Sequence, residues 1–150
     1  MPQSLSSVFI HAVFSTKLRQ PLLADPALRA EMHAYIGGVS SRLGCPPVAI
    51  GGVEDHAHVL VCLSRTTSIS EWIKEEKRVS TNFVKPRKTD FAWQGGYGVF
   101  STDIESLDRV AAYVRNQEEH HRKFSFQDEF RRLDDRAWNR MGRALRVGLT

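Results

Sequence analysis

Residues 51–61 read Gly51-Gly52-Val53-Glu54-Asp55-His56-Ala57-His58-Val59-Leu60-Val61. Side chains on a β-strand alternate between its two faces, so His56 and His58 leave the same face of this predicted strand. The apolar side chains of Ala57, Val59 and Val61 then point the other way, into a core. Two neutral imidazoles side by side are a suitable ligand pair for a divalent metal ion. By itself, however, such a pair is also typical of surface or packed histidines.

A second group of chemistry-bearing residues lies further along the chain, in Tyr113-Val114-Arg115-Asn116-Gln117. The stretch Thr102-Asp103-Ile104-Glu105 has the form of a capping box, which predicts the start of a helix. An apolar stripe at helical spacing follows in Leu107, Val110 and Val114. On this helix Tyr113 and Gln117 lie one turn apart on one face, beside the stripe, where they can border a cleft.

The rest of the chain predicts alternating strands and helices. Strands are expected at residues 8–14, 48–53, 57–63 and 97–101. Helices are expected from Asp25-Pro26 to Gly44, and from the capping box Ser68-Ile69-Ser70-Glu71 to about Val84, before Pro86. The order β-α-β-β-α-β, with an added helix, is the split βαβ pattern of ferredoxin-like folds. We therefore expect an α+β fold whose antiparallel sheet carries helices packed on one face and leaves the other to a partner.

Length and composition agree with a compact enzyme or binding domain. The chain has 150 residues, 41% of them hydrophobic and 25% charged, which suits one domain with a sizeable core. No apolar run approaches the roughly 20 residues that span a bilayer, and the start Met1-Pro2-Gln3-Ser4 does not resemble a signal peptide. We expect a cytoplasmic protein without a membrane segment. Cys45 and Cys62 are isolated and are expected to be reduced thiols rather than zinc ligands.

The charge distribution leaves two interpretations open. The net charge is +4, and the calculated pI is about 9.3. Basic side chains gather on the helix expected at 68–84 and again near the end of the chain, in Arg131, Arg132, Arg136, Arg140, Arg143 and Arg146. Because acidic residues are interleaved with them, these segments are either ordinary solvated surface or contacts to a phosphate backbone.

Taken together, these motifs resemble the single-tyrosine HUH transposases of small insertion sequences (IS200-like transposases), including the REP-associated tyrosine transposases. The name HUH describes His56-Ala57-His58, and the family has a tyrosine followed four residues later by a glutamine on a late helix, as in Tyr113 and Gln117. Further matching stretches are His11-Ala12-Val13-Phe14-Ser15-Thr16-Lys17, Trp93-Gln94-Gly95-Gly96-Tyr97-Gly98-Val99-Phe100-Ser101 and Asn116-Gln117-Glu118-Glu119-His120-His121. The similarity predicts a single domain over residues 1–150, with a core at about 8–133 and a basic C-terminal extension at 134–150.

The resemblance implies a metal-dependent endonuclease and strand transferase that acts in DNA transposition and recombination. Tyr113 is then the nucleophile that forms a 5′-phosphotyrosine link with single-stranded DNA at a hairpin-bearing end. The metal ligands are His56, His58 and Gln117. Imidazole suits Mn²⁺, and Mg²⁺ is the expected cellular ion. One nucleophilic tyrosine per chain favours a homodimer, and whether Tyr113 serves its own metal site or the partner's stays open.

Other residues receive smaller roles. The candidate DNA contacts are Lys74, Lys77, Arg78, Arg115, His120 and Arg122. We expect His11 to be a hydrogen-bonded sheet histidine rather than a ligand, and Glu54 and Asp55 either orient an imidazole or form a plain turn. An alternative function is a domesticated protein that binds DNA hairpins of repeats without transposition. A third is an RNA-binding ferredoxin-like domain with structural histidines.

Overall fold

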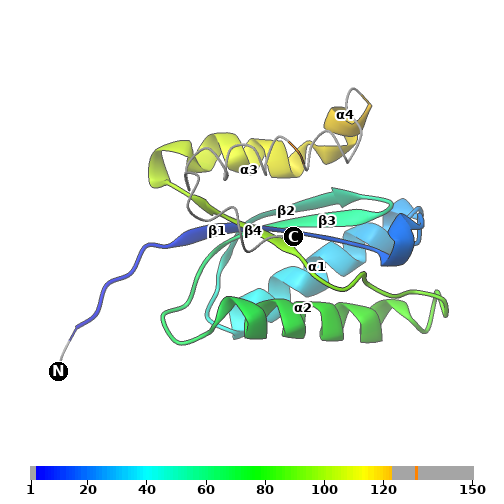
Figure 1. The fold of residues 1–150 in the computed structure, drawn as a ribbon, viewed down its shortest axis with the longest axis horizontal. Coiled ribbons are helices and arrows are strands. Elements are labelled where there is room, and N and C mark those ends of the chain that lie inside the picture. Colours follow the sequence, from blue (N-terminus) through cyan, green and yellow to red (C-terminus); the bar gives the residue numbers. More distant parts are fainter. Residues whose placement is uncertain (1–2, 123–130, 132–150) are drawn as a thin grey trace, which may run out of the picture. The chain divides into compact units, whose positions relative to one another are not determined.

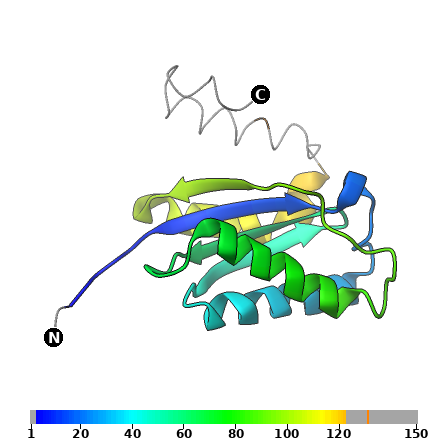
Figure 2. The same cartoon turned by 60° about the horizontal axis from the view of Figure 1, so that its bottom comes forward.

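The computed structural model describes residues 3–122 and residue 131 (Figures 1 and 2). The chain divides into two compact units, Met1–Gln117 and Glu118–Thr150. Among the described residues, the four-stranded sheet and the three longest helices belong to the first unit. The predicted core boundary at residue 133 and the extension at 134–150 lie outside the described residues. In the described part of the chain, no helix combines the length and apolar character needed to cross a membrane.

Four strands form one antiparallel sheet in the order β2-β3-β1-β4. They are β1 (Phe9–Ser15), β2 (Pro47–Val53), β3 (His56–Cys62) and β4 (Gly98–Thr102). The predicted α+β fold with an antiparallel sheet is confirmed, and each strand end lies within one residue of its expected position. Apolar β-branched side chains in β1 and β3 explain why these two strands occupy the centre of the sheet.

The helices α1 (Pro26–Arg42) and α2 (Ile69–Val84) pack together against one face of the sheet (Figure 1). Asp25 caps α1 by accepting a hydrogen bond from the Ala27 amide at 3.0 Å, and Ser68 caps α2 by accepting one from Glu71 at 3.1 Å, both as predicted. The helical spacing of Leu28, Met32, Ile36, Val39 and Leu43 predicts the buried face of this helix. The first four side chains are buried, and Leu43, the residue that ends the helix, is partly buried.

The helix α3 (Leu107–Arg115) packs on the opposite face, over β2 and β3. Figure 1 shows it on the far side of the sheet from α1 and α2. The prediction that the helices pack on one face is correct for α1 and α2. It is wrong for α3, which covers part of the face that was expected to be left to a partner. The contact is close because Gly51 has no side chain: a Cβ there would lie 1.9 Å from the Val114 carbonyl oxygen.

The start and end of α3 differ from the prediction. A short 3₁₀ turn, Ile104–Ser106, precedes the helix, and the capping side chain is Asp103, which accepts from the Ser106 amide at 2.8 Å. Thr102 is instead the last residue of β4. At its other end α3 stops before Asn116, which separates it from α4 (Gln117–His121). Asparagine competes with helical hydrogen bonding through its own side chain, which explains a break at this position.

Candidate active site

His56 and His58 lie side by side on β3, on the face of the sheet that α3 covers. Both side chains are fully buried, and their ring centroids are 5.1 Å apart. His58 is paired across the sheet with Gly51 of β2, the residue on which α3 rests. Ala57, between the two histidines, is buried in the main core on the other face. The alternation predicted from the sequence is therefore present.

Each of these two rings is held through its Nδ1 atom. His56 Nδ1 lies 2.7 Å from Oδ1 of Asp55, and His58 Nδ1 lies 2.8 Å from Nε2 of His11 on β1. A carboxylate only accepts, so His56 carries its proton on Nδ1 when Asp55 is ionised. The expectation that His11 is a hydrogen-bonded sheet histidine is confirmed. Glu54 and Asp55 form the turn between β2 and β3, and Asp55 is the one whose carboxylate also contacts the His56 ring.

Tyr113 on α3 brings a hydroxyl-bearing ring to the same place. Its ring is half-buried and stands edge-on to His58, with centroids 5.7 Å apart and planes at 89°. It stands edge-on to His11 as well, at 6.1 Å and 80°. Three elements that are distant in the sequence, β1, β3 and α3, thus converge on one cluster of rings. Such edge-to-face contacts between rings are favourable and fix their relative orientation.

Gln117 is the last residue of the first unit and the first residue of α4. Its side chain is 1% exposed, and its Nε2 donates to the Tyr113 carbonyl oxygen at 2.9 Å. The predicted one-turn relation between Tyr113 and Gln117 therefore persists across the break at Asn116. With the amide nitrogen used as a donor, the amide oxygen is the atom of Gln117 that has the chemistry of a metal ligand.

A turn to which sequence analysis gave no role supports Asp55. It is the 3₁₀ turn Lys17–Arg19, in which Leu18 and Arg19 both have positive φ, 56° and 55°. Buried Thr16, just before it, donates from its amide to the Asp55 carbonyl oxygen at 2.8 Å and from its hydroxyl to the Gln20 carbonyl oxygen at 2.6 Å. Arg19 Nη2 lies 3.8 Å from Oδ2 of Asp55. The only sequence signal was that Thr16 lies in a stretch that matches the family.

Three of the predicted DNA contacts lie on α2, on the other side of the sheet from the histidines. Lys77 donates to the carbonyl oxygens of Gln94 and Gly96 at 2.9 and 2.7 Å, and burial lowers its pKa. Arg78 pairs with Glu75 at 2.8 Å. Lys74 is exposed. Lys77 therefore has a structural task, and the proposed DNA contacts on α2 stay predictions.

The remaining basic candidates lie near the end of the described segment. Arg115 on α3 donates from Nη2 to the Val48 carbonyl oxygen at 3.0 Å. His120 and Arg122 belong to the second unit, where Arg122 pairs with Glu119 at 3.3 Å. Of the basic residues near the C-terminus only Arg131 is among the described residues. Contacts of Arg115, His120 and Arg122 with DNA stay predictions.

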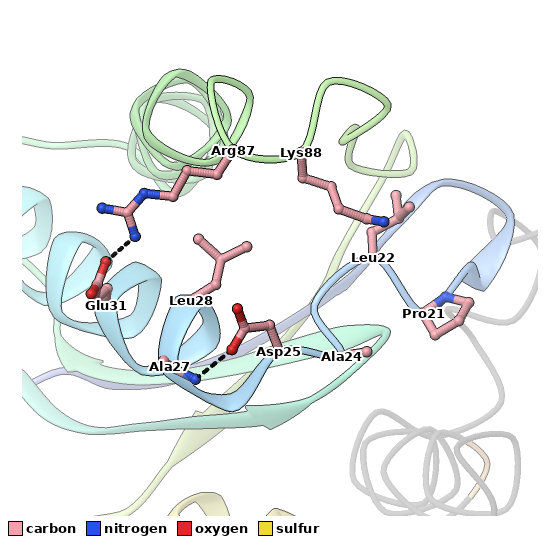
Figure 3. A pocket seen from close by; sticks show the side chains of 9 residues that line it. All are labelled: Pro21, Leu22, Ala24, Asp25, Ala27, Leu28, Glu31, Arg87 and Lys88. Atoms are coloured by element: carbon pink, nitrogen blue, oxygen red, sulfur yellow. Dashed lines mark hydrogen bonds and ion pairs between the residues drawn. The ribbon is translucent and has the colours of Figure 1, made fainter.

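A separate pocket of about 230 Å³ lies between the start of α1 and the segment that follows α2 (Figure 3). Arg87 and Lys88 line it together with Asp25 and Glu31, and Arg87 pairs with Glu31 across it. Its charges are therefore balanced. None of its lining residues belongs to the ring cluster around His58, so it has no direct part in that site.

Comparisons with known proteins agree with the fold. The family model described as "Transposase IS200 like" matches residues 4–117. A candidate transposase from Deinococcus radiodurans R1 has a similar structure, with a TM-score of 0.60 at 18% identity, over 78% of this chain and 95% of that one. A REP-associated tyrosine transposase bound to a REP hairpin gives 0.53 at 15% identity, over 76% of this chain and 70% of that one. No curated protein matches the sequence significantly.

Proposed function

Because the chain belongs to the IS200-like transposase family, we propose that it is a metal-dependent endonuclease and strand transferase for single-stranded DNA. The observation that carries the proposal is the edge-on contact of Tyr113 with His58, 5.7 Å between centroids. A tyrosine and a histidine pair from distant parts of the sequence meet there, and both histidines are buried. A half-buried tyrosine that merely packs would not need two oriented imidazoles beside it.

The residues present fit a divalent metal ion. The Nδ1 atoms of His56 and His58 are engaged by Asp55 and His11, so Nε2 of each ring is the nitrogen with which it would bind a metal, an arrangement typical of histidine ligands. The amide oxygen of Gln117 is the proposed third ligand. Two imidazoles and one amide oxygen suit Mn²⁺ and similar ions, with Mg²⁺ as the proposed cellular ion. When bound, the ion would polarise the phosphoryl oxygens.

Tyr113 is the proposed nucleophile. Its phenol oxygen forms a bond to the phosphorus of the scissile phosphodiester, and the bond from phosphorus to the 3′ oxygen breaks. The phenol loses its proton, and the departing 3′ oxygen gains one to become a free hydroxyl. The product is a 5′-phosphotyrosine link that keeps the energy of the broken bond, so that a second 3′-hydroxyl can displace the tyrosine without ATP.

For the substrate, we propose single-stranded DNA at a hairpin-bearing end. The structural neighbour that is described as bound to a REP hairpin supports this choice. A single proposed nucleophile per chain cannot cleave both ends of an element in one step, and we therefore propose a homodimer, which sedimentation equilibrium can test.

A covalent-trapping assay tests this function. Labelled hairpin DNA with a single-stranded flank is incubated with the protein and Mn²⁺ or Mg²⁺, and denaturing gels reveal any protein–DNA adduct. We expect a metal-dependent adduct that Tyr113→Phe abolishes. The matched control is Tyr97→Phe, because Tyr97 is also a surface-reaching tyrosine, 45% exposed, and it should leave the adduct intact.

The alternative function has its own signature in the same assay. Tight hairpin binding without any adduct, across several candidate hairpins, would replace the proposed enzyme by a repeat-binding protein. An adduct that survives in Tyr113→Phe would instead show that another residue is the nucleophile.

A further inference from the structure

We propose that His11 is a positioning residue that holds the proton of His58 on Nδ1 and so presents Nε2 of His58 to the metal ion. The inference rests on the proposed function, because it concerns the same metal site. It adds a residue outside the proposed ligand set and gives that residue one defined task, which is the choice of tautomer at His58.

The sheet register places the two rings on one face. His11 on β1 is the cross-strand partner of Leu60, two residues from His58, so His11 and His58 are diagonal neighbours across the central strand pair. Their ring planes are nearly parallel, at 24°, and the centroids are 5.0 Å apart. His11 is 2% exposed and His58 fully buried. The short, buried contact between Nε2 of His11 and Nδ1 of His58 is therefore built into the sheet.

The proton count on this contact has a consequence. A hydrogen bond between Nε2 of His11 and Nδ1 of His58, which lie 2.8 Å apart, needs one proton, which belongs to one ring or the other. A neutral imidazole binds a metal through the nitrogen that carries no proton. When His58 donates from Nδ1 and His11 accepts, Nε2 of His58 is the ligand nitrogen. In the opposite arrangement His58 carries its own proton on Nε2, and that proton must leave before a metal binds.

His11 also contacts the proposed nucleophile. Its ring meets the ring of Tyr113 at 6.1 Å and 80°, while the ring of Tyr113 meets His58 at 5.7 Å. The rings of His11, His58 and Tyr113 therefore all contact one another, and His11 cannot rotate without displacing the other two rings. This packing explains how the hydrogen bond between His11 and His58 holds a fixed orientation.

The chain offers a matched control histidine. His33 lies on α1, which covers the opposite face of the sheet. Burial, and then the nearby Arg29 charge, lower the pKa of His33 to about 4. Its Nε2 makes no hydrogen bond within the described residues. The charged form of His58 contributes to this lowering as well, but His33 is neutral at pH 7 and forms no hydrogen bond with His11 or His58. His33→Leu thus removes a neutral imidazole without removing a charge or a hydrogen bond from either ring.

The experiment compares three variants with the wild-type protein. His11→Leu removes the acceptor, His11→Gln restores one through its amide oxygen, and His33→Leu is the control. Nitrogen-15 NMR of the metal-free protein reads the tautomer of His58, and titration calorimetry with Mn²⁺ reads the affinity. Thermal unfolding of each metal-free variant shows whether a loss of affinity comes from an unstable fold or from a changed tautomer of His58.

We expect a single Nδ1–H tautomer for His58 in the wild type and in His11→Gln, and a mixture in His11→Leu. Mn²⁺ affinity should fall about 10- to 100-fold in His11→Leu, recover in His11→Gln and stay unchanged in His33→Leu. Equal affinities in all four proteins, or a proton of His58 found on Nε2 in the wild type, would overturn the role of His11 and leave the metal site intact. A wild-type protein that binds no Mn²⁺ would overturn the metal site, and the role of His11 with it.

Discussion

The ring of Tyr113 stands edge-on to the ring of His58 in the same chain, with centroids 5.7 Å apart and planes at 89°. Gly51 makes this contact possible, because it is the cross-strand partner of His58 and lets the backbone of α3 approach at Val114. The proposed nucleophile is thus positioned by the packing of α3 on the sheet of the same chain. This packing bears on whether Tyr113 serves the metal site of its own chain or that of a partner.

We predict that Tyr113 serves the histidine pair of its own chain. Two inactive variants, Tyr113→Phe and His58→Ala, should therefore form no covalent DNA adduct when they are mixed, because neither chain contains both halves of a site. Each variant mixed with wild-type protein is the control and should keep the wild-type adduct. Recovery of the adduct in the mixture of the two variants would show that the tyrosine acts on the partner's site.

Gly51→Ala should displace α3 from the sheet. The new Cβ would lie 1.9 Å from the Val114 carbonyl oxygen, and backbone cannot yield as a flexible side chain does. We expect a loss of about 1–3 kcal/mol in unfolding free energy and a fall in adduct formation on the order of 10- to 100-fold, since small displacements of reacting groups are costly. Urea unfolding and the trapping assay measure the two effects.

Gly38→Ala is the matched control. Gly38 lies inside α1, and a Cβ there would meet nothing within 4 Å. Alanine in a helix interior should stabilise the protein by roughly 0.5–1 kcal/mol and leave adduct formation unchanged. If Gly51→Ala behaved like Gly38→Ala, close packing of α3 would not be what places Tyr113.

Asp55→Ala should weaken the proposed metal site through His56. Without the carboxylate 2.7 Å from Nδ1, the ring loses the acceptor that fixes its proton and its orientation. We expect Mn²⁺ affinity to fall about 10- to 100-fold, as measured by titration calorimetry. Glu54→Ala, which removes the exposed neighbouring carboxylate, should have little effect. An equal loss of Mn²⁺ affinity in both variants would show that the negative charge near the site matters, and not the hydrogen bond between Asp55 and His56.

Much of the fold could be predicted because local signals agreed with the tertiary structure. The caps Asp25 and Ser68 and the buried stripe of α1 act within a few residues, and they predicted the helix positions correctly. The alternation around His56 and His58 likewise predicted which face of β3 each side chain occupies.

What could not be predicted depends on contacts between distant segments. The side of the sheet that α3 covers follows from Gly51 meeting Val114, which no local pattern encodes. The support of Asp55 by Thr16 and Arg19 depends on a turn with two positive φ angles in residues that rarely adopt them. Charge patterning on α2 also suggested DNA contact for Lys77, whose actual bonds lie within the chain.

Lys77→Met should destabilise the protein more than Lys74→Met. Methionine keeps an apolar stem against Phe14, whose ring centroid lies 5.8 Å from the Lys77 ammonium nitrogen, but it loses the two bonds to the loop at Gln94 and Gly96. Both carbonyl oxygens are exposed, so water can replace the ammonium group, and each lost bond should cost about 0.5–1.5 kcal/mol. Thermal unfolding compares the variants, and equal midpoints would mean that the loop does not depend on Lys77.

Glu76 should make the stability of the protein depend on pH. Its carboxyl group on α2 is fully buried and accepts from the Ser40 hydroxyl, to which Trp72 Nε1 donates at 2.9 Å. Burial raises the pKa of Glu76 from 4.5 to about 7. The protonated form is therefore favoured in the folded state. The contribution of the protonated Glu76 to the unfolding free energy is complete below about pH 4.5 and is lost as the pH rises to about 7.

Glu76→Gln removes this dependence, because the amide stays neutral at every pH. We expect the difference in unfolding free energy between the variant and the wild type to shift in favour of the variant by about 3 kcal/mol between pH 4.5 and pH 8. Glu75→Gln is the control: Glu75 is more exposed, and its hydrogen bond to Arg78 lowers its pKa, so its titration lies largely below this window. Urea unfolding at several pH values measures all three proteins, and parallel curves for Glu76→Gln and the wild type would show that the buried carboxyl does not titrate there.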